Sequence, residues 1–315
     1  MKGVLRYFIF IAESYLFISA CAIVLGLWFP EFFSGFSSYT TLMLQVIFFL
    51  SSLKLKTSDL FHTAKQWKSL LAVNAVLLIV LPILVYSIAH YLNLAPTFAI
   101  ALILLASMPA GMSLPLMVDA IGGHRSFALI LTISSSLLAP FTVPLALSLL
   151  ASTNVDLPLL DMMQRLLFVI VLPFILAQMA HYFLRINIRK IVPVFKPVSL
   201  LLLGLLIAAS IAMYAETIHG TATDLMTTVG MLFIFFIAIH VFSHLIFFYK
   251  PYQEQVTIAA SVTFMNFTLA IYLASLYIPD PRVLLTLVLA IVPWALLLIP
   301  FKAVTDRMKT HGWIL

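Results

Sequence analysis

Apolar runs long enough to cross a bilayer as helices, about 20 residues each, recur from one end of the chain to the other. Short stretches with proline, charged or other polar residues separate them. This pattern predicts ten transmembrane helices, here called spans 1 to 10, over residues 5–29, 36–53, 68–92, 97–121, 126–151, 161–184, 195–215, 223–248, 254–278 and 282–304. The predicted fold is an all-α polytopic membrane protein, with residues 1–315 in a single membrane domain.

The composition agrees with this fold and excludes other classes. Hydrophobic residues make up 63% of the chain and charged residues 9%, with a mean hydropathy of +1.16, whereas about a quarter of a soluble domain is charged. The net charge of +6 comes from basic residues in short loops, so we predict no nucleic-acid partner. A single cysteine, Cys21, excludes a disulfide framework. We predict no cofactor or metal, and interpret the first apolar run as span 1 rather than a signal peptide.

The basic residues predict how the spans are oriented. With ten spans, all of the 17 lysines and arginines except Arg165 and Arg282 fall at the two ends of the chain and in the even-numbered loops. These regions lie on one side of the membrane, and loops rich in positive charge stay in the cytoplasm. We therefore expect a cell-membrane protein, in the inner membrane of a Gram-negative organism, with both termini cytoplasmic.

Ten spans divide into two halves of five, and the odd number predicts that the second half is inverted relative to the first. The halves also share an irregularity at corresponding places. Span 4 contains SMPAGMSLP over residues 107–115, and span 9 contains the polar, β-branched stretch TIAASVTFMNFT over residues 257–268. Interrupted helices at matching positions indicate a binding site near the bilayer midplane. Spans 4 and 9 are therefore predicted to be discontinuous helices that cross.

A break in a membrane helix leaves backbone amides and carbonyls that lipid cannot satisfy. Such a break persists where protein buries it or where it lines a water-filled cavity, and the amides that begin a half-helix attract anions. The alternative for span 4 is a simple proline kink, with the freed groups satisfied by Ser107, Ser113 or neighbouring helices. The matching stretch in span 9 favours a ligand site.

Several stretches resemble the bile acid:sodium symporter family. They are MPAG at 108–111, GHRSFALILT at 123–132, SSLLAP at 135–140, LKTSDL at 55–60 and TIAASVTFMNFTLA at 257–270. The family carries a C-P-G-G-like break in span 4, a T-T-V-S-T-L-L-A-P stretch in span 5 and a T-I-A-x-E-V-G-M-Q-N-S-G-L-A stretch in span 9. The likeness covers most of the chain.

The resemblance implies a fold of two parts. Spans 1, 2, 6 and 7 would form a panel over residues 1–60 and 158–218. Spans 3–5 and 8–10 would form a core over residues 66–152 and 222–304. The resemblance also implies that an organic anion, such as a steroid or another carboxylate, binds between panel and core, while two sodium ions bind behind the crossing of spans 4 and 9.

Most residues that the resemblance assigns to sodium are replaced in this chain. Thr132 is kept and Asn266 lies beside the ligands, but the other assigned positions hold Leu77, Leu114, Pro115, Ala128, Ser261 and Met265. Sodium needs several oxygen ligands to offset the cost of leaving water, and apolar side chains supply none. We therefore predict that sodium coupling of the family type is lost.

The candidate substrate-binding residues are the polar side chains expected at the crossing, namely Ser113, Thr132, Ser135, Thr263, Asn266 and Thr268. The candidates for a coupling ion are Thr132, Ser261, Glu13 and His240, because ionisable groups within a membrane are functional candidates and histidine titrates near neutral pH. Snorkelling toward Lys2 or Arg6 is the alternative for Glu13, and a structural hydrogen bond is the alternative for His240.

Together these features predict a secondary transporter that moves a small organic anion or amphipath by alternating access. Transport would be proton-coupled or facilitative rather than driven by sodium. The alternative is a non-transporting membrane receptor or ligand-binding module on the same fold. The chain contains no nucleotide-binding loop, nucleophile elbow or metalloprotease motif, so we predict that it is not an enzyme.

Overall fold

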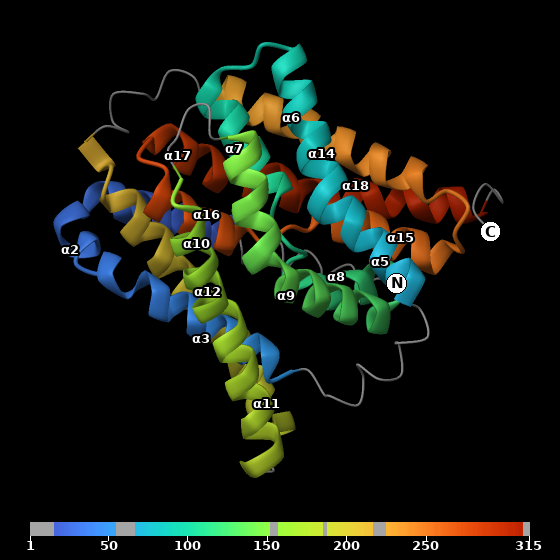
Figure 1. Ribbon diagram of the computed structural model, residues 1–315, viewed down its shortest axis with the longest axis horizontal. Coiled ribbons are helices and arrows are strands. Elements are labelled where there is room, and N and C mark those ends of the chain that lie inside the picture. The colour runs from blue at the N-terminus through green and yellow to red at the C-terminus, as the bar shows by residue number, and fades with distance from the viewer. Residues whose placement is uncertain (1–15, 55–66, 152–156, 185–187, 217–224, 311–315) are drawn as a thin grey trace.

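The computed structural model describes residues 16–54, 67–151, 157–184, 188–216 and 225–310. Within these ranges the secondary structure is helical, and the one β-bridge joins two helix breaks. The helices lie in a single packed bundle (Figure 1). After a first helix over Leu16–Trp28 they are, in chain order, α2 (Pro30–Ser34), η1 (Ser37–Tyr39), α3 (Thr40–Ser52), α5 (Trp67–Ala75), η3 (Val76–Val80), α6 (Leu81–Tyr91), α7 (Pro96–Ala106), α8 (Leu114–Ile121), α9 (Arg125–Leu150), α10 (Leu159–Leu166), η4 (Leu167–Val171), α11 (Leu172–Leu184), α12 (Ile188–Ala212), α14 (Leu225–Ile246), α15 (Tyr252–Thr263), α16 (Phe267–Tyr277), α17 (Pro281–Leu289) and α18 (Ile291–Thr310).

Seven helical segments are long and apolar enough to cross a membrane, and they coincide with predicted spans 2, 3, 5, 6, 7, 8 and 10. They are Pro30–Ser52, Trp67–Tyr91, Arg125–Leu150, Leu159–Ala180, Ile191–Ala212, Leu225–Ile246 and Pro281–Arg307. Spans 1, 4 and 9 contain the shorter apolar helices Leu16–Trp28, Pro96–Ala106 and Phe267–Tyr277. The described part of span 1 begins at residue 16, and spans 4 and 9 are interrupted. The number ten and the inverted repeat therefore stay predictions.

The outer surface of the bundle is apolar, as a lipid-facing surface must be. Ile79, Leu149, Phe168 and Ile234 each expose more than half of their side chains although they lie in the middle or last turns of long helices. A soluble bundle would place polar residues on this face. The described helices therefore suit a multi-pass membrane protein in which the bilayer, rather than water, surrounds the apolar surface.

Both predicted helix interruptions are present in the structure. Span 4 divides into α7 and α8, with residues 107–113 between them, and span 9 divides into α15 and α16, with residues 264–266 between them. Pro109 and Pro115 explain the first break, because proline lacks an amide hydrogen and its ring clashes with the preceding helical turn. The second break contains no proline or glycine, so local sequence does not account for it.

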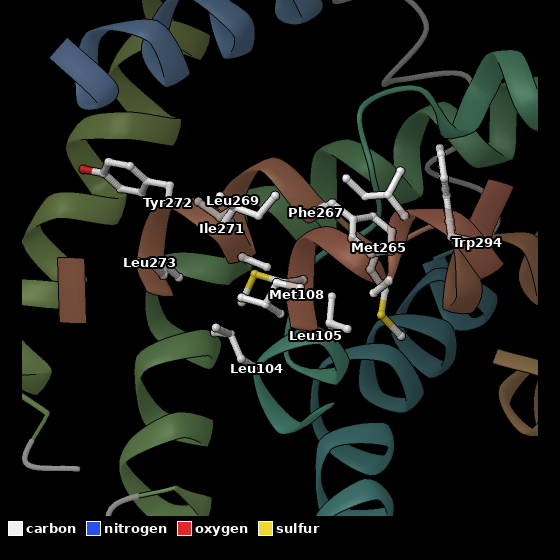
Figure 2. Packing of buried hydrophobic residues seen from close by; sticks show 14 of the residues in the cluster. Leu104, Leu105, Met108, Met265, Phe267, Leu269, Ile271, Tyr272, Leu273 and Trp294 are labelled. Atoms are coloured by element: carbon white, nitrogen blue, oxygen red, sulfur yellow. The ribbon is translucent and has the colours of Figure 1, made fainter. Parts of the chain in front are cut away.

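The half-helices beside the breaks are the most deeply buried part of the bundle. Each residue from 101 to 106 of α7 and from 269 to 274 of α16 is at most 4% exposed. Figure 2 shows Leu104, Leu105 and Met108 packed near Leu269 and Leu273 of α16. Helices α7 and α16 are too short to cross a bilayer alone. Their burial indicates that the breaks at their ends lie inside the protein rather than against lipid.

A second group of helices packs on one side of the breaks. Helix α3 contacts α11 and α12, and α12 also contacts α2 and α16. In Figure 1, α2, α3, α11 and α12 lie together at the side of the bundle away from α14, α15 and α18. Space between this group and the two breaks forms the candidate site.

Candidate functional site

The two helix breaks pair with each other through their backbones. Ala110 and Met265 form an antiparallel bridge, in which the Gly111 amide donates to the Phe264 carbonyl at 2.6 Å and the Asn266 amide donates to the Pro109 carbonyl at 2.9 Å. The two unwound strands thus satisfy one another's freed groups, which lipid cannot do. This pairing also explains why span 9 opens where it does.

Gly111 is required by the close approach of the two breaks. A Cβ atom at this position would lie 2.9 Å from the Phe264 carbonyl oxygen and 3.1 Å from that of Met265. Both atoms belong to backbone and cannot rotate away. The remaining amide of the bridge is held from a third helix, since Ala110 N donates to Ser135 Oγ of α9 at 3.2 Å.

Two half-helices begin at this crossing. The residue before α8 is Ser113, and Asn266 caps α16 by accepting a hydrogen bond from the Leu269 amide at 3.1 Å. The first amides of a helix carry partial positive charge and attract anions. The starts of α8 and α16 therefore bring two such helix ends to the same place.

A cavity of about 170 Å³ lies against the crossing. One wall comes from α3 and α12, and the other comes from the two breaks, α8, α9 and α18. Apolar and aromatic side chains form most of the lining, with Phe48 on the first wall and Phe267 and Trp294 on the second. The rings of Phe267 and Trp294 are 5.4 Å apart and meet edge to face, beside the Met265 break (Figure 2).

Three cations also line the cavity, namely Lys54, Arg125 and Lys196, and its described lining includes no aspartate or glutamate. Lys54 follows α3, and its exposed side chain marks one opening of the cavity to solvent. Although the side chain reaches solvent, the surrounding protein lowers the pKa of Lys54 through desolvation, and the charge of Lys196 lowers it further. Arg125 is more than half exposed and lies 3.7 Å from Asp119.

Sequence reasoning did not select these three cations as site residues. The positive-inside rule accounts for basic residues at span ends, so Lys54, Arg125 and Lys196 were explained without a ligand. Their spacing offered one further signal, because Ser51 and Lys54 as well as Lys196 and Ser199 are three residues apart and can share a helix face. All four of these residues line the cavity.

Four of the predicted substrate-binding residues line the cavity, namely Ser113, Thr132, Asn266 and Thr268. The other two are not part of its described lining. Ser135 holds the Ala110 amide, and Thr263 donates back to the carbonyls of Ala259 and Ala260 within α15.

The positions that the resemblance assigns to sodium are buried among apolar side chains. Leu77, Leu114 and Ala128 are fully buried, Met265 is 2% exposed, and Pro115 is also buried. Thr132 donates to the Ala128 carbonyl within its own helix at 2.9 Å. Among the residues that the structure describes, no cluster of three or more histidine, cysteine, aspartate or glutamate side chains could hold a metal ion.

The remaining coupling-ion candidates lie apart from one another. Ser261 is fully buried and donates to the carbonyls of Thr257 and Ile258. His240 Nδ1 is 2.7 Å from the Phe236 carbonyl oxygen, and its ring packs 4.8 Å from Phe301 between α14 and α18. Glu13 lies outside the described residues.

A second polar cluster ties α10 and α3 to α16 at the other end of α3. Asp161 accepts hydrogen bonds from Arg165 Nε at 2.9 Å and from the Tyr277 hydroxyl at 2.6 Å. One turn away on α16, the Tyr272 hydroxyl lies 3.0 Å from Thr41 Oγ1. We call these five residues the Asp161 network.

The fold and the site define a multi-pass membrane protein with two interrupted helices that meet at a cation-lined cavity. The sequence matches the SBF-like CPA transporter family over residues 13–304, and the chain belongs to this family. This result agrees with the resemblance to bile acid:sodium symporters and with the prediction that the chain is not an enzyme.

Three curated relatives are similar to the chain. The Bacillus subtilis (strain 168) uncharacterized sodium-dependent transporter YocS is 26% identical over 69% of this chain and 65% of its own length. The Arabidopsis thaliana probable sodium/metabolite cotransporter BASS1, chloroplastic, is 22% identical over 82% and 64%. The Danio rerio sodium/bile acid cotransporter 7 is 26% identical over 66% and 63%. The matched region thus spans somewhat less than two thirds of each relative.

Proposed function

We propose that the protein is a secondary transporter that moves a small organic anion or amphipath by alternating access. The observation that carries this proposal is the cavity between α3 and α12 on one side and the paired helix breaks on the other. Two helix starts and three cations favour a negatively charged group there. The apolar and aromatic lining favours a hydrophobic body on the same molecule.

The proposal includes the ten-span, inverted-repeat architecture, with a panel over residues 1–60 and 158–218 and a core over residues 66–152 and 222–304. The packing of α3 against α11 and α12, and of α12 against α2, supports this division. The distribution of basic residues favours a location in the cell membrane with both termini in the cytoplasm. The opening beside Lys54 then faces the cytoplasm, and the Asp161 network lies toward the outside.

Alternating access requires that contacts between panel and core exchange from one side of the membrane to the other. The Asp161 network joins panel helices α3 and α10 to core helix α16, while the cavity reaches solvent beside Lys54. This arrangement suits an inward-open state with a closed outer end. Breaking these few hydrogen bonds while the walls close around Lys54 would expose the cavity to the opposite side.

Sodium coupling is not part of the proposed mechanism, although the three relatives are named as sodium-dependent transporters or cotransporters. The buried apolar side chains of Leu77, Leu114, Ala128 and Met265 would leave a sodium ion without the oxygen ligands that offset its desolvation. Transport is therefore facilitative or proton-coupled. Leu114, Pro115 and Met265 occupy positions to which the resemblance assigns sodium ligands. These three residues set this chain apart from the implied ligand pattern.

Counterflow in proteoliposomes tests the proposal. Purified protein is reconstituted with a panel of unlabelled carboxylates and sulfonates inside, and uptake of the labelled compound is followed with and without a proton gradient. We expect transient accumulation of at least one anion above that in protein-free vesicles, with the same amplitude in sodium and potassium buffers. Absence of exchange for every anion tested would contradict a transporter. Entry of a fixed number of sodium ions with each anion would contradict the absence of sodium coupling.

The second candidate function is a receptor on the same fold, and the loss of ion-ligand side chains favours it because a receptor needs no coupling. Ligand-induced thermal stabilisation of the purified protein separates the two. Stabilisation by an anion that shows no counterflow would indicate a receptor, whereas stabilisation together with counterflow would indicate a carrier.

A further inference from the structure

The cation-lined end of the cavity contains an arrangement that the helix crossing does not explain. Ser51 and Lys54 lie at the end of α3, and Lys196 and Ser199 lie in the first half of α12. Helices α3 and α12 pack against each other, and all four side chains line the same cavity. Two serine–lysine pairs from neighbouring helices therefore meet at one place.

We propose that Lys54 and Lys196, with Ser51 and Ser199, bind the acidic group of the transported amphipath, while its apolar body extends toward Phe48 and Trp294. This inference rests on the proposed function and assigns the residues that select a charged substrate. Carboxylate, sulfonate and phosphate groups share the required chemistry, since each offers several oxygen acceptors with negative charge.

The positive charges of Lys54 and Lys196 act on each other at this end of the cavity. Lys196 Nζ is buried, and the charge of Lys196 lowers the pKa of Lys54. Water reaches Lys54 from the surface, so an anion can enter at this end. An acidic group between the two ammonium groups would replace repulsion with attraction, and the low dielectric of the cavity would strengthen that attraction.

Ser199 provides an independent indication of a ligand. Its hydroxyl is buried and has no hydrogen-bond partner within the described structure, although buried hydroxyl groups are nearly always paired. Ser199 lies one turn from Lys196 on α12 and lines the cavity. An oxygen of the bound acid would accept the hydrogen bond that this hydroxyl group otherwise lacks.

The third cation of the cavity is less suited to this role. Arg125 belongs to α9, on the opposite wall, and faces Asp119 at 3.7 Å with both side chains more than half exposed. Its positive charge is therefore partly balanced by a carboxylate and screened by solvent. Lys54 also lies 5.9 Å from the centroid of the Phe195 ring, which holds the ammonium group near Lys196 on α12.

Ligand binding by the purified full-length protein tests the assignment. The probes are phenylbutyrate and its sulfonate and phosphate analogues, each compared with the uncharged phenylbutyramide. We expect saturable thermal stabilisation by at least one of the anions and none by the amide. Lys54→Gln and Lys196→Gln should each weaken binding of that anion about tenfold or more, the size of a hydrogen bond to a charged group, and Ser199→Ala should weaken it less.

The controls separate charge from folding. Lys68→Gln removes an exposed lysine away from the cavity and should leave binding unchanged, while Lys54→Arg should keep most of the affinity because it keeps the charge. The unfolding temperature without ligand checks that each variant is folded, and Ser199→Ala together with Lys54→Arg tests the site if a glutamine variant does not fold.

Equal stabilisation by the amide, unchanged binding in both glutamine variants, or no stabilisation by any of the three anions would overturn the assignment. Counterflow of the same probes distinguishes this failure from failure of the proposed function. Lysine-dependent binding without exchange would retain the anion site and reject the carrier. Exchange of phenylbutyramide that is unaffected by Lys54→Gln and Lys196→Gln would retain the carrier and reject the anion site.

Discussion

The two ends of α3 differ in the charged groups that lie beside them. At one end, Lys54 and Lys196 line the same wall of a cavity whose described lining has no carboxylate. At the other end, Arg165 pairs with Asp161, which also accepts the Tyr277 hydroxyl group. Thr41 and Ser51 are about 15 Å apart at the 1.5 Å rise of an α-helix, so both arrangements lie along the same wall.

In our interpretation, the Lys54 end of α3 is a ligand site, and the Asp161 end is a contact that keeps the cavity closed on that side. Opposite charges that are paired and hydrogen-bonded within the protein hold helices together, whereas positive charges that line an open cavity favour an anionic ligand there. The break at Met265 lines the same cavity as Lys54, and α16 leads from this break to Tyr277 of the Asp161 network. In our account the crossing is the fixed element about which the open end and the closed end exchange.

Disruption of the helix crossing should cause the largest change, because it affects both stability and counterflow. Gly111→Val places a side chain against the carbonyls of Phe264 and Met265, so the breaks must separate and both ends lose their common support. We expect destabilisation of about 1–3 kcal/mol, as for other overpacked sites, and loss of counterflow. Thermal unfolding and exchange assays measure the two effects.

Gly230→Ala is the matched control, because no atom lies within 4 Å of a Cβ at Gly230 and alanine favours a helix over glycine. It should retain full stability and exchange. A Gly111→Val protein with wild-type stability and exchange would show that the backbone pairing is not essential.

The pH dependence of anion binding should sharpen the contrast at the lysine end. Lys54 binds an anion when it is protonated, and its pKa lies below the usual 10.5 because of desolvation and the charge of Lys196. Affinity is therefore complete at pH values below this lowered pKa and falls as the pH rises through it. The other titratable groups that line the cavity are Lys196 and Arg125.

The affinity of a phenylbutyrate-type anion measured at several alkaline pH values tests this direction, with a loss of about tenfold once Lys54 is neutral. Lys54→Arg should move the loss to much higher pH, because arginine stays charged. Lys68→Arg should leave the profile as in the wild type. Affinity that rises through the same alkaline range would contradict the assignment.

Opening the closed end should have a moderate effect. Tyr277→Phe removes one hydrogen bond to Asp161. The loss of about 1 kcal/mol shifts the equilibrium between the closed and open states of this end roughly fivefold. Leu44 lines the cavity and is fully buried, one turn from Thr41. In a Cys21→Ala background, Leu44→Cys should react about fivefold faster with an impermeant maleimide added from the Asp161 side.

Tyr91→Phe serves as the control for this measurement, because Tyr91 is 83% exposed and outside the network. It should not change the labelling rate. Equal labelling rates in Tyr277→Phe and wild-type protein would show that the Asp161 network does not hold this end closed.

The smallest expected effect is the difference in anion exchange between two threonine substitutions in span 9. Thr268 lines the cavity, whereas Thr263 donates to carbonyls of its own helix. We expect Thr268→Val to weaken anion exchange about two- to threefold, the lower range of a lost hydrogen bond, and Thr263→Val to leave exchange unchanged. The reverse order would favour the broader set of substrate-binding residues predicted from the sequence.

The sequence predicted the first break well and the second only by position in the chain. Pro109, Gly111 and Pro115 mark the unwound part of span 4 directly. Span 9 has no comparable residue, and the exact place of its break depends on hydrogen bonds from Gly111 and to Pro109. A long-range backbone pairing of this kind has no local sequence signal.

The residues of the candidate site could be predicted from the sequence only in part, because some of them come together through long-range packing. Polar residues near the breaks include Ser113, Asn266 and Thr268, which line the cavity. Lys54 and Lys196 are far apart in sequence, and the topology rule already explained each of them. Their role as a pair depends on the packing of α12 against α3, which the apolar pattern of the two spans does not specify.

Trans-stimulation of anion efflux without sodium tests the central claim most directly. Proteoliposomes loaded with a labelled anion that binds the protein are diluted into N-methylglucamine buffer with or without the same unlabelled anion outside. The account predicts faster efflux with external anion, reduced in Lys54→Gln and unchanged in Lys68→Gln. Efflux that is independent of external anion, or that requires sodium, would contradict a sodium-independent alternating-access carrier.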